Sequence, residues 1–173
     1  RIGSEGMELK NEVTNNSGLE TIARVGQSFC LPAAFDTLTW YGKGPWETYA
    51  DRKDAALIGL YTSSVAEQHV PFAVPCECGG HEETRFAALS DGTHTVQIVG
   101  SDDFHFSALP YSIAEYRKAT YEEELPEQTT GTWLILDVAH AGLGGDTGWT
   151  KNIHPEYRVC KGRYSYTFRF HFA

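Results

Sequence analysis

The residues best placed for chemistry lie in one stretch near the C-terminus, where an apolar run enters a glycine-rich loop. His140 closes the apolar run, and Asp146 and Trp149 follow in the loop. Glycines permit sharp turns, and an indole displayed on such a loop is not held from both sides as a core tryptophan usually is. A flat apolar ring suits the C–H face of a sugar. Trp149 is therefore the leading candidate for ligand binding, with packing under a neighbouring loop as the alternative.

The other two candidates in this stretch have competing structural roles. His140 ends a buried strand, where a hydrogen-bonded core histidine is favoured over a ligand contact. Asp146 could accept a hydrogen bond from a sugar hydroxyl, although closing an Asx-turn over the loop is the more frequent role. The glycine run could in principle cradle a phosphate, but it lacks the following Lys and Ser or Thr and any helical pattern.

Elsewhere the reactive side chains form no recognisable catalytic constellation. The acidic runs at residues 82–83 and 122–124 are flanked by polar residues and are interpreted as solvated faces. Seven histidines and many serines form no nucleophile elbow. Cys76-x-Cys78 followed by His81 is half of a zinc motif, which is weak without a second pair.

The sequence does not determine whether the cysteines form disulfide bonds. Four of them allow three full pairings, and the sequence cannot choose among these. Unpaired, reduced thiols are favoured. The four are Cys30, Cys76, Cys78 and Cys160.

Composition bounds the class of protein. A chain of 173 residues with 41% hydrophobic and 13% aromatic residues can bury the core of one globular domain. The net charge of −9, with no basic cluster, argues against nucleic-acid and anionic-membrane partners. No apolar run approaches the eighteen or so residues that a membrane span needs. Residues 1–6 read as mid-chain sequence, so the compartment stays unassigned.

Hydrophobic periodicity indicates β-structure. From Tyr164 to Phe172 aromatic residues alternate with polar ones, which predicts a strand with one aromatic face. Residues 84–89 and 93–99 flank the turn signal Ser90-Asp91-Gly92 and should form a hairpin. A short helix is expected over residues 112–119, with Ser112 as N-cap and Glu115 three residues on. Further strands are expected at residues 7–13, 23–31, 35–40, 104–108 and 132–139. The sequence predicts one all-β domain over residues 1–173, an antiparallel β-sandwich.

Three ordered motifs resemble a known family. The first is G-x-G-P-x-E-x-Y-x-D-R at residues 42–52, the second is Pro75-Cys76-Glu77 with Thr84-Arg85, and the third spans residues 140–149. In order and spacing they resemble the C-terminal domain of the large bacterial β-galactosidases of glycoside hydrolase family 2. The resemblance covers the chain from about Met7 to its end. It implies a galactose-mutarotase-like supersandwich, of which this chain would be the C-terminal part.

The resemblance also implies a function for the whole protein. Family members hydrolyse terminal β-galactosides with two glutamates about 5 Å apart, carried on a barrel domain outside this chain, so we expect the chain alone to be inactive. Trp149 matches a tryptophan that reaches the mouth of the barrel's active site and stacks on the aglycone or on shallowly bound substrate. Gly148 stands where a serine is familiar, which could loosen the loop.

Partners and cofactors follow from the same resemblance. The partners expected are a β-galactoside substrate and the barrel domain of the same polypeptide, and unpaired sheet edges would favour a homo-oligomer. No cofactor is expected in this fragment, whereas Mg²⁺ and Na⁺ would belong to the parent enzyme. The alternative is a free-standing carbohydrate-binding or mutarotase-like module, which would need a glutamate base and a histidine acid converging on the sugar.

Overall fold

Antiparallel strands make up most of the computed structural model, which describes residues 2–3, 6–144 and 152–173. Three 3₁₀ turns and one α-helix lie among them. The strands are β1 (Ile2–Gly3), β2 (Gly6–Thr14), β3 (Thr21–Ile22), β4 (Arg24–Leu31), β5 (Thr37–Gly44), β6 (Leu57–Ser64), β7 (Gly80–Ser90), β8 (Thr95–Leu109), β9 (Thr132–His140), β10 (Val159–Cys160) and β11 (Arg163–Phe172). The helical segments are η1 (Ala66–Gln68), α1 (Ile113–Lys118), η2 (Glu122–Glu124) and η3 (Pro155–Tyr157).

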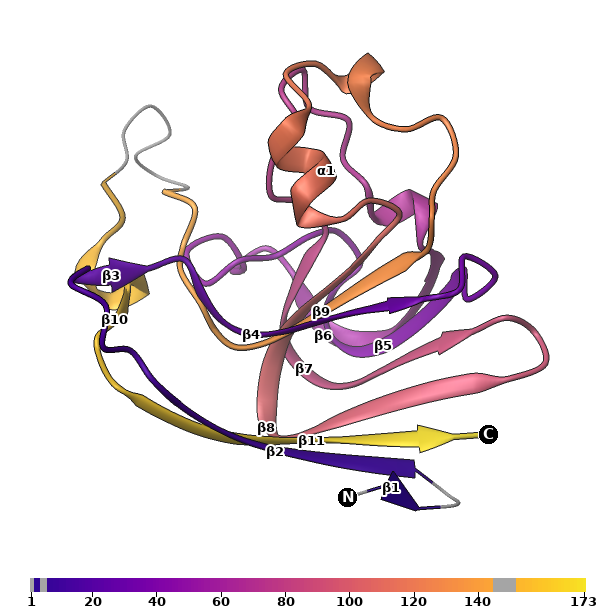
Figure 1. Cartoon of the computed structure of the whole chain (residues 1–173), viewed down its shortest axis with the longest axis horizontal. Coiled ribbons are helices and arrows are strands. Elements are labelled where there is room, and N and C mark those ends of the chain that lie inside the picture. The colour runs from indigo at the N-terminus through magenta and orange to yellow at the C-terminus, as the bar shows by residue number, and fades with distance from the viewer. Residues whose placement is uncertain (1, 4–5, 145–151) are drawn as a thin grey trace.

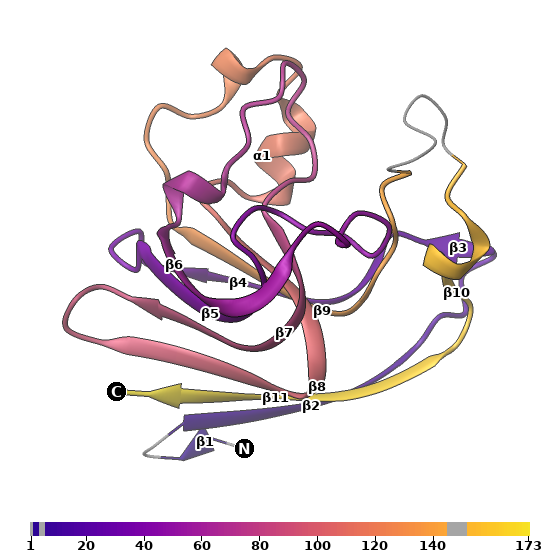
Figure 2. The same cartoon turned by 180° about the vertical axis from the view of Figure 1, so that it is seen from behind.

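The 15-residue strand β8 organises the sheet. It pairs with β7 along most of its length, but its other edge changes partner part-way. Residues 96–100 pair with β11, whereas residues 105–109 pair with β9, which in turn pairs with β4. The sheet therefore divides into two layers that both contain part of β8. In Figures 1 and 2, β2 and β11 form one layer, and β4 and β9 lie above it on the side of α1.

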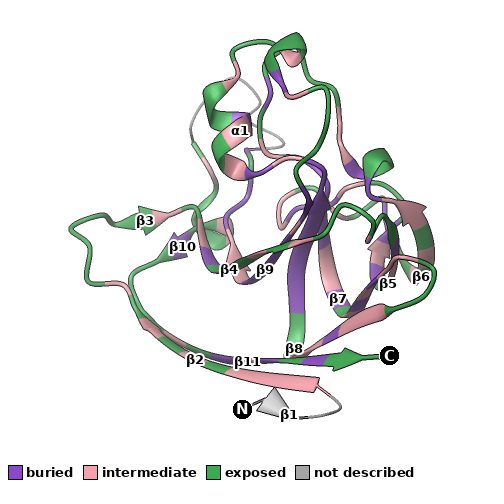
Figure 3. Cartoon of the chain, turned by 45° about the vertical axis from the view of Figure 1, so that its right-hand side comes forward, coloured by how far each residue is buried: buried purple, intermediate pink, exposed green. Residues whose placement is uncertain are grey.

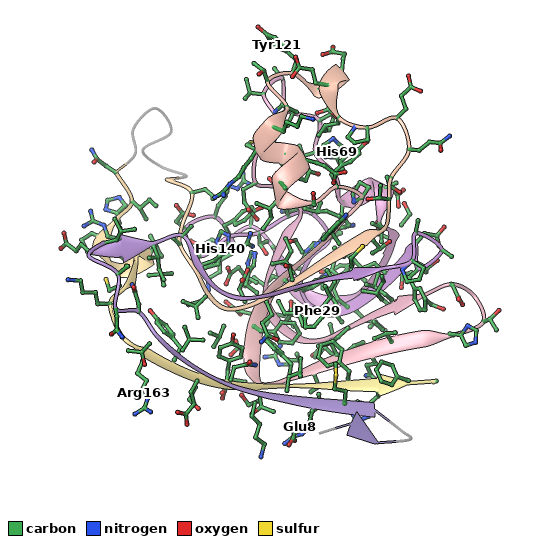
Figure 4. The ribbon with its side chains drawn as sticks, in the orientation of Figure 1. Glu8, Phe29, His69, Tyr121, His140 and Arg163 are labelled. Carbon is green, nitrogen blue, oxygen red and sulfur yellow. The ribbon has the colours of Figure 1, made fainter. Side chains whose placement is uncertain are left out.

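Aromatic side chains fill the space between the layers. The rings of Phe29 on β4 and Phe170 on β11 meet edge to face with centroids 5.2 Å apart (Figure 4). Phe104 on β8 meets Phe168 in the same way at 5.4 Å. Tyr166, Phe168 and Phe170 of the predicted aromatic face of β11 thus pack into the core, and burying them contributes to stability, whereas Phe172 at the end of the strand is 49% exposed. The fold is an all-β sandwich, as the sequence predicts.

Local signals in the sequence specify several elements correctly. All the expected strands form, and α1 begins with a complete capping box in which Ser112 and Glu115 satisfy each other's backbone N–H. Two expectations need correction. The segments at 93–99 and 104–108 are one continuous strand, and the hairpin loop has four residues, 91–94, because Ser90 pairs with Thr95.

The strand β6 was not predicted, and it leaves apolar side chains on the surface. It pairs with β5 along one edge, and Leu57 and Leu60 are 74% and 67% exposed. Trp46, in the segment between β5 and β6, is 58% exposed. Figure 3 shows the contrast between this region and the buried second half of β8. Within the described ranges, no helix combines the length and apolar composition that a membrane crossing requires.

A buried histidine lies in the core beside Trp40. His81 is 1% exposed, its ring centroid is 4.2 Å from that of Trp40, and its Nε2 is 2.6 Å from Gln68 Oε1. Burial lowers the pKa of His81 to about 3. Because the unfolded chain binds this proton with an ordinary pKa near 6.5, the stabilisation is complete above pH 6.5 and is lost as pH falls towards 3.

This linkage predicts that the difference in free energy of unfolding between the wild type and the His81→Gln variant depends on pH. Below pH 6.5 the stability advantage of the wild type should shrink by about 1.4 kcal/mol per pH unit, because one proton separates the two states. Urea unfolding of both proteins between pH 7 and pH 5 measures it. Comparing the two proteins cancels the other groups that titrate in this range. A difference that does not change with pH would show that His81 can be protonated without unfolding.

Candidate functional site

A cavity of about 910 Å³ lies where the ends of β3, β4 and β9 meet α1 and β10. Its walls are largely apolar, with Ile22, Leu109 and Ile135 among them. Among its charged and polar lining residues, Arg24, Glu77 and His140 lie close together, because Glu77 pairs with both of the others. An apolar pocket with a few converging polar groups is the usual form of a small-molecule site.

Arg24 binds two carboxylates at once. Its Nη2 and Nε donate to Asp137 Oδ2 at 2.7 and 3.0 Å, and its Nη1 donates to Glu77 Oε2 at 3.0 Å. The pairing of β4 with β9 brings Arg24 to Asp137 across 113 residues of sequence. At this end of β4 the register shifts between Val25 and Gly26, which is a β-bulge that redirects the strand.

Two histidines complete the cluster. The rings of His105 and His140 stack with centroids 4.4 Å apart. His140 Nδ1 lies 2.7 Å from the Ala141 carbonyl and its Nε2 lies 3.6 Å from Glu77 Oε1, in the interior position labelled in Figure 4. His105 Nδ1 lies 2.9 Å from Glu82 Oε1. The cluster therefore joins β4, β8, β9 and the segments before and within β7.

Burial shifts the ionisation of these groups in different directions. It raises the pKa of Asp137 to about 6, although Arg24 opposes the shift. Burial also acts to raise the pKa of Glu77, but His140 and Arg24 outweigh it and leave this pKa below its ordinary value. The pKa values of these two partners of Arg24 shift in opposite directions because the Asp137 side chain is 1% exposed and that of Glu77 is 28% exposed. Burial holds the pKa of His105 well below its usual range, so this imidazole is neutral.

The glycine-rich loop is anchored at the edge of the cavity. Asp51 accepts hydrogen bonds from the backbone N–H of Leu143 at 3.0 Å and of Gly144 at 2.6 Å. The N–H of Gly142 donates to the Tyr157 carbonyl at 2.9 Å. A Cβ at Gly142 would lie 2.6 Å from the Asp51 carboxyl, so this contact requires glycine. Asp51 thus fixes the first residues of the loop in which Trp149 occurs.

Sequence comparison settles the family. A family model described as beta galactosidase small chain matches residues 1–170. The chain belongs to the β-galactosidase small-chain family. A β-galactosidase of Vibrio cholerae is 37% identical over 165 residues, which are 95% of this chain and 15% of that protein. A β-galactosidase of Priestia megaterium is 35% identical over 162 residues (93% and 16%), and beta-galactosidase 2 of Enterobacter cloacae is 39% identical over 146 residues (84% and 14%).

The small-chain match covers a fraction of each relative. The chain spans about 15% of the length of these curated β-galactosidases. Two of the three motifs that carry the family resemblance meet at the cavity. Glu77 and His140 line it together, and Asp51 of the first motif anchors the loop of the third. Residues far apart in this β-galactosidase small chain therefore converge on one place.

The sequence-based site candidates have different outcomes. His140 lies in the cluster and lines the cavity. Trp149 and Asp146 lie outside the described residues, so their roles remain predictions. The zinc half-motif is not assembled, because Cys78 Sγ lies 3.7 Å from Tyr116 Oη whereas His81 bonds to Gln68. All four cysteines are free.

One expectation about the acidic runs was wrong. Glu82 is not part of a solvated face: its side chain is 14% exposed and is turned towards His105, although Glu83 pairs with Lys53 nearer the surface. Arg24, Asp137 and His105 were missed altogether. Their signal was present, since a charged or imidazole residue inside an otherwise apolar strand must find a partner when buried.

Proposed function

We propose that this chain is the C-terminal accessory part of a β-galactosidase and shapes the aglycone end of a sugar site whose catalytic carboxylates lie elsewhere in the protein. The observation that carries the proposal is the anchored loop. Backbone N–H groups of residues 142, 143 and 144 are held by Tyr157 and Asp51, so the loop leaves the sandwich from a fixed base. Such a base limits the entropy lost when a loop aromatic such as Trp149 stacks on a sugar.

The partners follow from this role. The substrate is a terminal β-galactoside, and the barrel domain of the same polypeptide supplies the two glutamates. Mg²⁺ and Na⁺ belong to the parent enzyme in this proposal and not to the histidine cluster of this chain, because a hard cation such as Mg²⁺ prefers oxygen ligands and the cluster offers two imidazoles. Among the described residues β6 pairs with β5 alone, and its second edge with the exposed leucines favours a covering partner, either another domain or a second subunit.

The first test is activity of the chain by itself. Purified chain should release nitrophenol from a nitrophenyl β-galactoside no faster than buffer does. Turnover that survives extensive purification and resists removal of trace enzyme would contradict the accessory role.

The second test concerns Trp149 in the intact enzyme. Trp149→Ala should raise KM for lactose roughly five- to tenfold and lower kcat less, because an aromatic contact is worth about 1–1.5 kcal/mol and the cleavage carboxylates are untouched. Trp46→Ala is the matched control, because Trp46 is an exposed indole that lies outside the loop. An unchanged KM in Trp149→Ala would mean that this ring only packs.

Asp51 should also influence KM, because it anchors the start of the loop. Asp51→Asn keeps an acceptor oxygen but loses the anion that takes two N–H groups, so KM should rise by roughly threefold with kcat nearly unchanged. Asp54→Asn is a nearby control outside the loop contact. A fall in kcat without a rise in KM would show that Asp51 acts in some other way.

A second function is favoured by the polar part of the cavity. Glu77 and His140, 3.6 Å apart, form a carboxylate–imidazole pair that a free-standing sugar-binding module could use. Arg24 and His140 keep the pKa of Glu77 low, which makes it a weak base, so sugar binding suits this pair better than mutarotation. Nuclear magnetic resonance of the chain with galactose separates these cases: line broadening indicates binding, and faster anomeric exchange indicates mutarotation.

A further inference from the structure

Three side chains from separate segments each present a ligand atom to one small space. They are Glu77 from the segment before β7, His105 from β8 and His140 from the end of β9, and their ligand atoms all lie within 4.8 Å of one another. Within the described ranges this is the one such group of three or more His, Cys, Asp or Glu residues. The proposed role of the chain in β-galactoside hydrolysis does not use it.

The hydrogen bonds of His140 determine which nitrogen is free. A backbone carbonyl can only accept, so the contact to Ala141 O places the proton on Nδ1 of His140. In the tautomer with its only proton on Nδ1, Nε2 is an acceptor, and it faces Glu77 Oε1 at 3.6 Å. Two acceptors facing each other repel unless a cation lies between them. That cation is either a metal ion or a second proton on the ring.

His105 repeats the arrangement in a fully enclosed position. Its Nδ1 contacts Glu82 Oε1 at 2.9 Å, and its Nε2 is buried without a hydrogen-bond partner among the described residues. The residue is 4% exposed, so water offers little compensation. A histidine whose Nδ1–H is held by a carboxylate or a carbonyl, with Nε2 left free, is the usual state of a metal ligand. His105 is in this state, and His140 shares the held Nδ1 but has its Nε2 facing Glu77 Oε1 at 3.6 Å.

The local charge favours a cation. Arg24 serves both Glu77 and Asp137, so one positive charge faces two carboxylates, and Asp137 Oδ1 is buried without a partner among the described residues. Arg24 is bound mainly through Glu77 Oε2, at 3.0 Å, whereas Oε1 is the oxygen nearer to His140. The oxygen that a metal would use is therefore the less strongly engaged of the two.

We propose that Glu77, His105 and His140 bind a divalent transition-metal ion of the Zn²⁺ and Co²⁺ class, through one carboxylate oxygen and the two Nε2 atoms. Imidazole with carboxylate suits these ions, whereas Mg²⁺ and Ca²⁺ prefer oxygen ligands alone. Ligand atoms around a tetrahedral zinc are roughly 3.4 Å apart, so side chains must close in by about 1 Å. The position left open would face the cavity that Glu77 and His140 line.

The test is a Co²⁺ titration of the polypeptide that carries this chain at its natural length. Wild type should bind one more Co²⁺ than His105→Gln, with a visible absorption band that Zn²⁺ displaces, and Glu77→Gln should weaken that site by roughly a hundredfold or more. His171→Gln, which removes an exposed histidine, should keep the site. Because variants are compared, metal ions bound elsewhere cancel.

Two further measurements keep the proposal falsifiable if the His105 variant misfolds. X-ray absorption of zinc-loaded wild type should show nitrogen and oxygen neighbours with imidazole scattering from this site. Cys76→Ser should retain the extra ion, because Cys76 lies at the same cavity but outside the ligand set. Equal Co²⁺ stoichiometry in wild type and His105→Gln, a sulfur neighbour, or loss of the ion in Cys76→Ser would overturn the proposal and leave a second proton on His140 as the cation.

Discussion

Arg24→Met should lower the free energy of unfolding by about 3–5 kcal/mol, because it leaves a buried carboxylate without its partner. The Asp137 side chain is 1% exposed and takes two of its hydrogen bonds from Arg24 at 2.7 and 3.0 Å. Methionine keeps the apolar part of the side chain, so the loss of stability measures the effect of removing the charged guanidinium. Urea unfolding curves of the two proteins give the difference directly.

Two control variants separate this effect from ordinary surface electrostatics. Arg163→Met removes an ion pair whose partners, Arg163 and Glu12, have side chains 73% and 69% exposed, so it should change stability by less than about 0.5 kcal/mol. The double variant Arg24→Met, Asp137→Asn should be more stable than Arg24→Met alone, because the buried charge is then removed as well. A loss below 1 kcal/mol in Arg24→Met would mean that water or another cation reaches Asp137.

Trp40→Ala should cost a similar amount, about 3–5 kcal/mol, through a cavity in the core. Trp40 is 1% exposed, and its ring packs against Tyr61, His81 and Phe106. Its Nε1–H also donates to the Lys43 carbonyl at 3.0 Å, and the substitution removes this hydrogen bond. Thermal or urea unfolding measures the loss.

The matched control is Trp46→Ala, which removes the same ring from a site 58% exposed. It should cost under about 1 kcal/mol. Similar losses in the two variants would show that the exposed ring of Trp46 is buried by something else in solution. That result would also identify a contact surface around the loop after β5.

Much of the fold could be predicted because strand alternation and capping are local signals. The aromatic row of β11 and the Ser112–Glu115 box are both contained within a few residues of sequence. β6 was missed because apolar residues stand next to each other at Leu57-Ile58, so its sequence lacks the alternation of apolar and polar residues that indicates a strand. In the structure both of these side chains are exposed. The continuity of β8 was missed because the polar run Ser101-Asp102-Asp103 interrupts the alternation of apolar and polar residues, although these residues are part of the strand.

The site could be predicted only in part because its contacts are long-range. The family motifs point to His140 and Glu77, but Arg24 reaches Asp137 only after β4 pairs with β9. Glu82 and His105 meet because β7 and β8 pair with register shifts near Thr84. No spacing rule in the sequence connects these residues. Trp149 and Asp146 remain predictions from the motif, and Asp51 adds a physical reason why their loop starts where it does.

The shared strand β8 has a consequence for how the domain folds. Because the first half of β8 carries β11 and its second half carries β9, neither layer can lose its central strand without exposing the other. The two layers should therefore open as one cooperative unit rather than as independent foldons. Assembly must also wait for distant segments, since the N-terminal β2 pairs with the C-terminal β11. Such non-local pairing makes β-sheet domains slow to fold, so apolar side chains that are buried only in the folded chain, such as Phe168 and Phe170, stay exposed for longer.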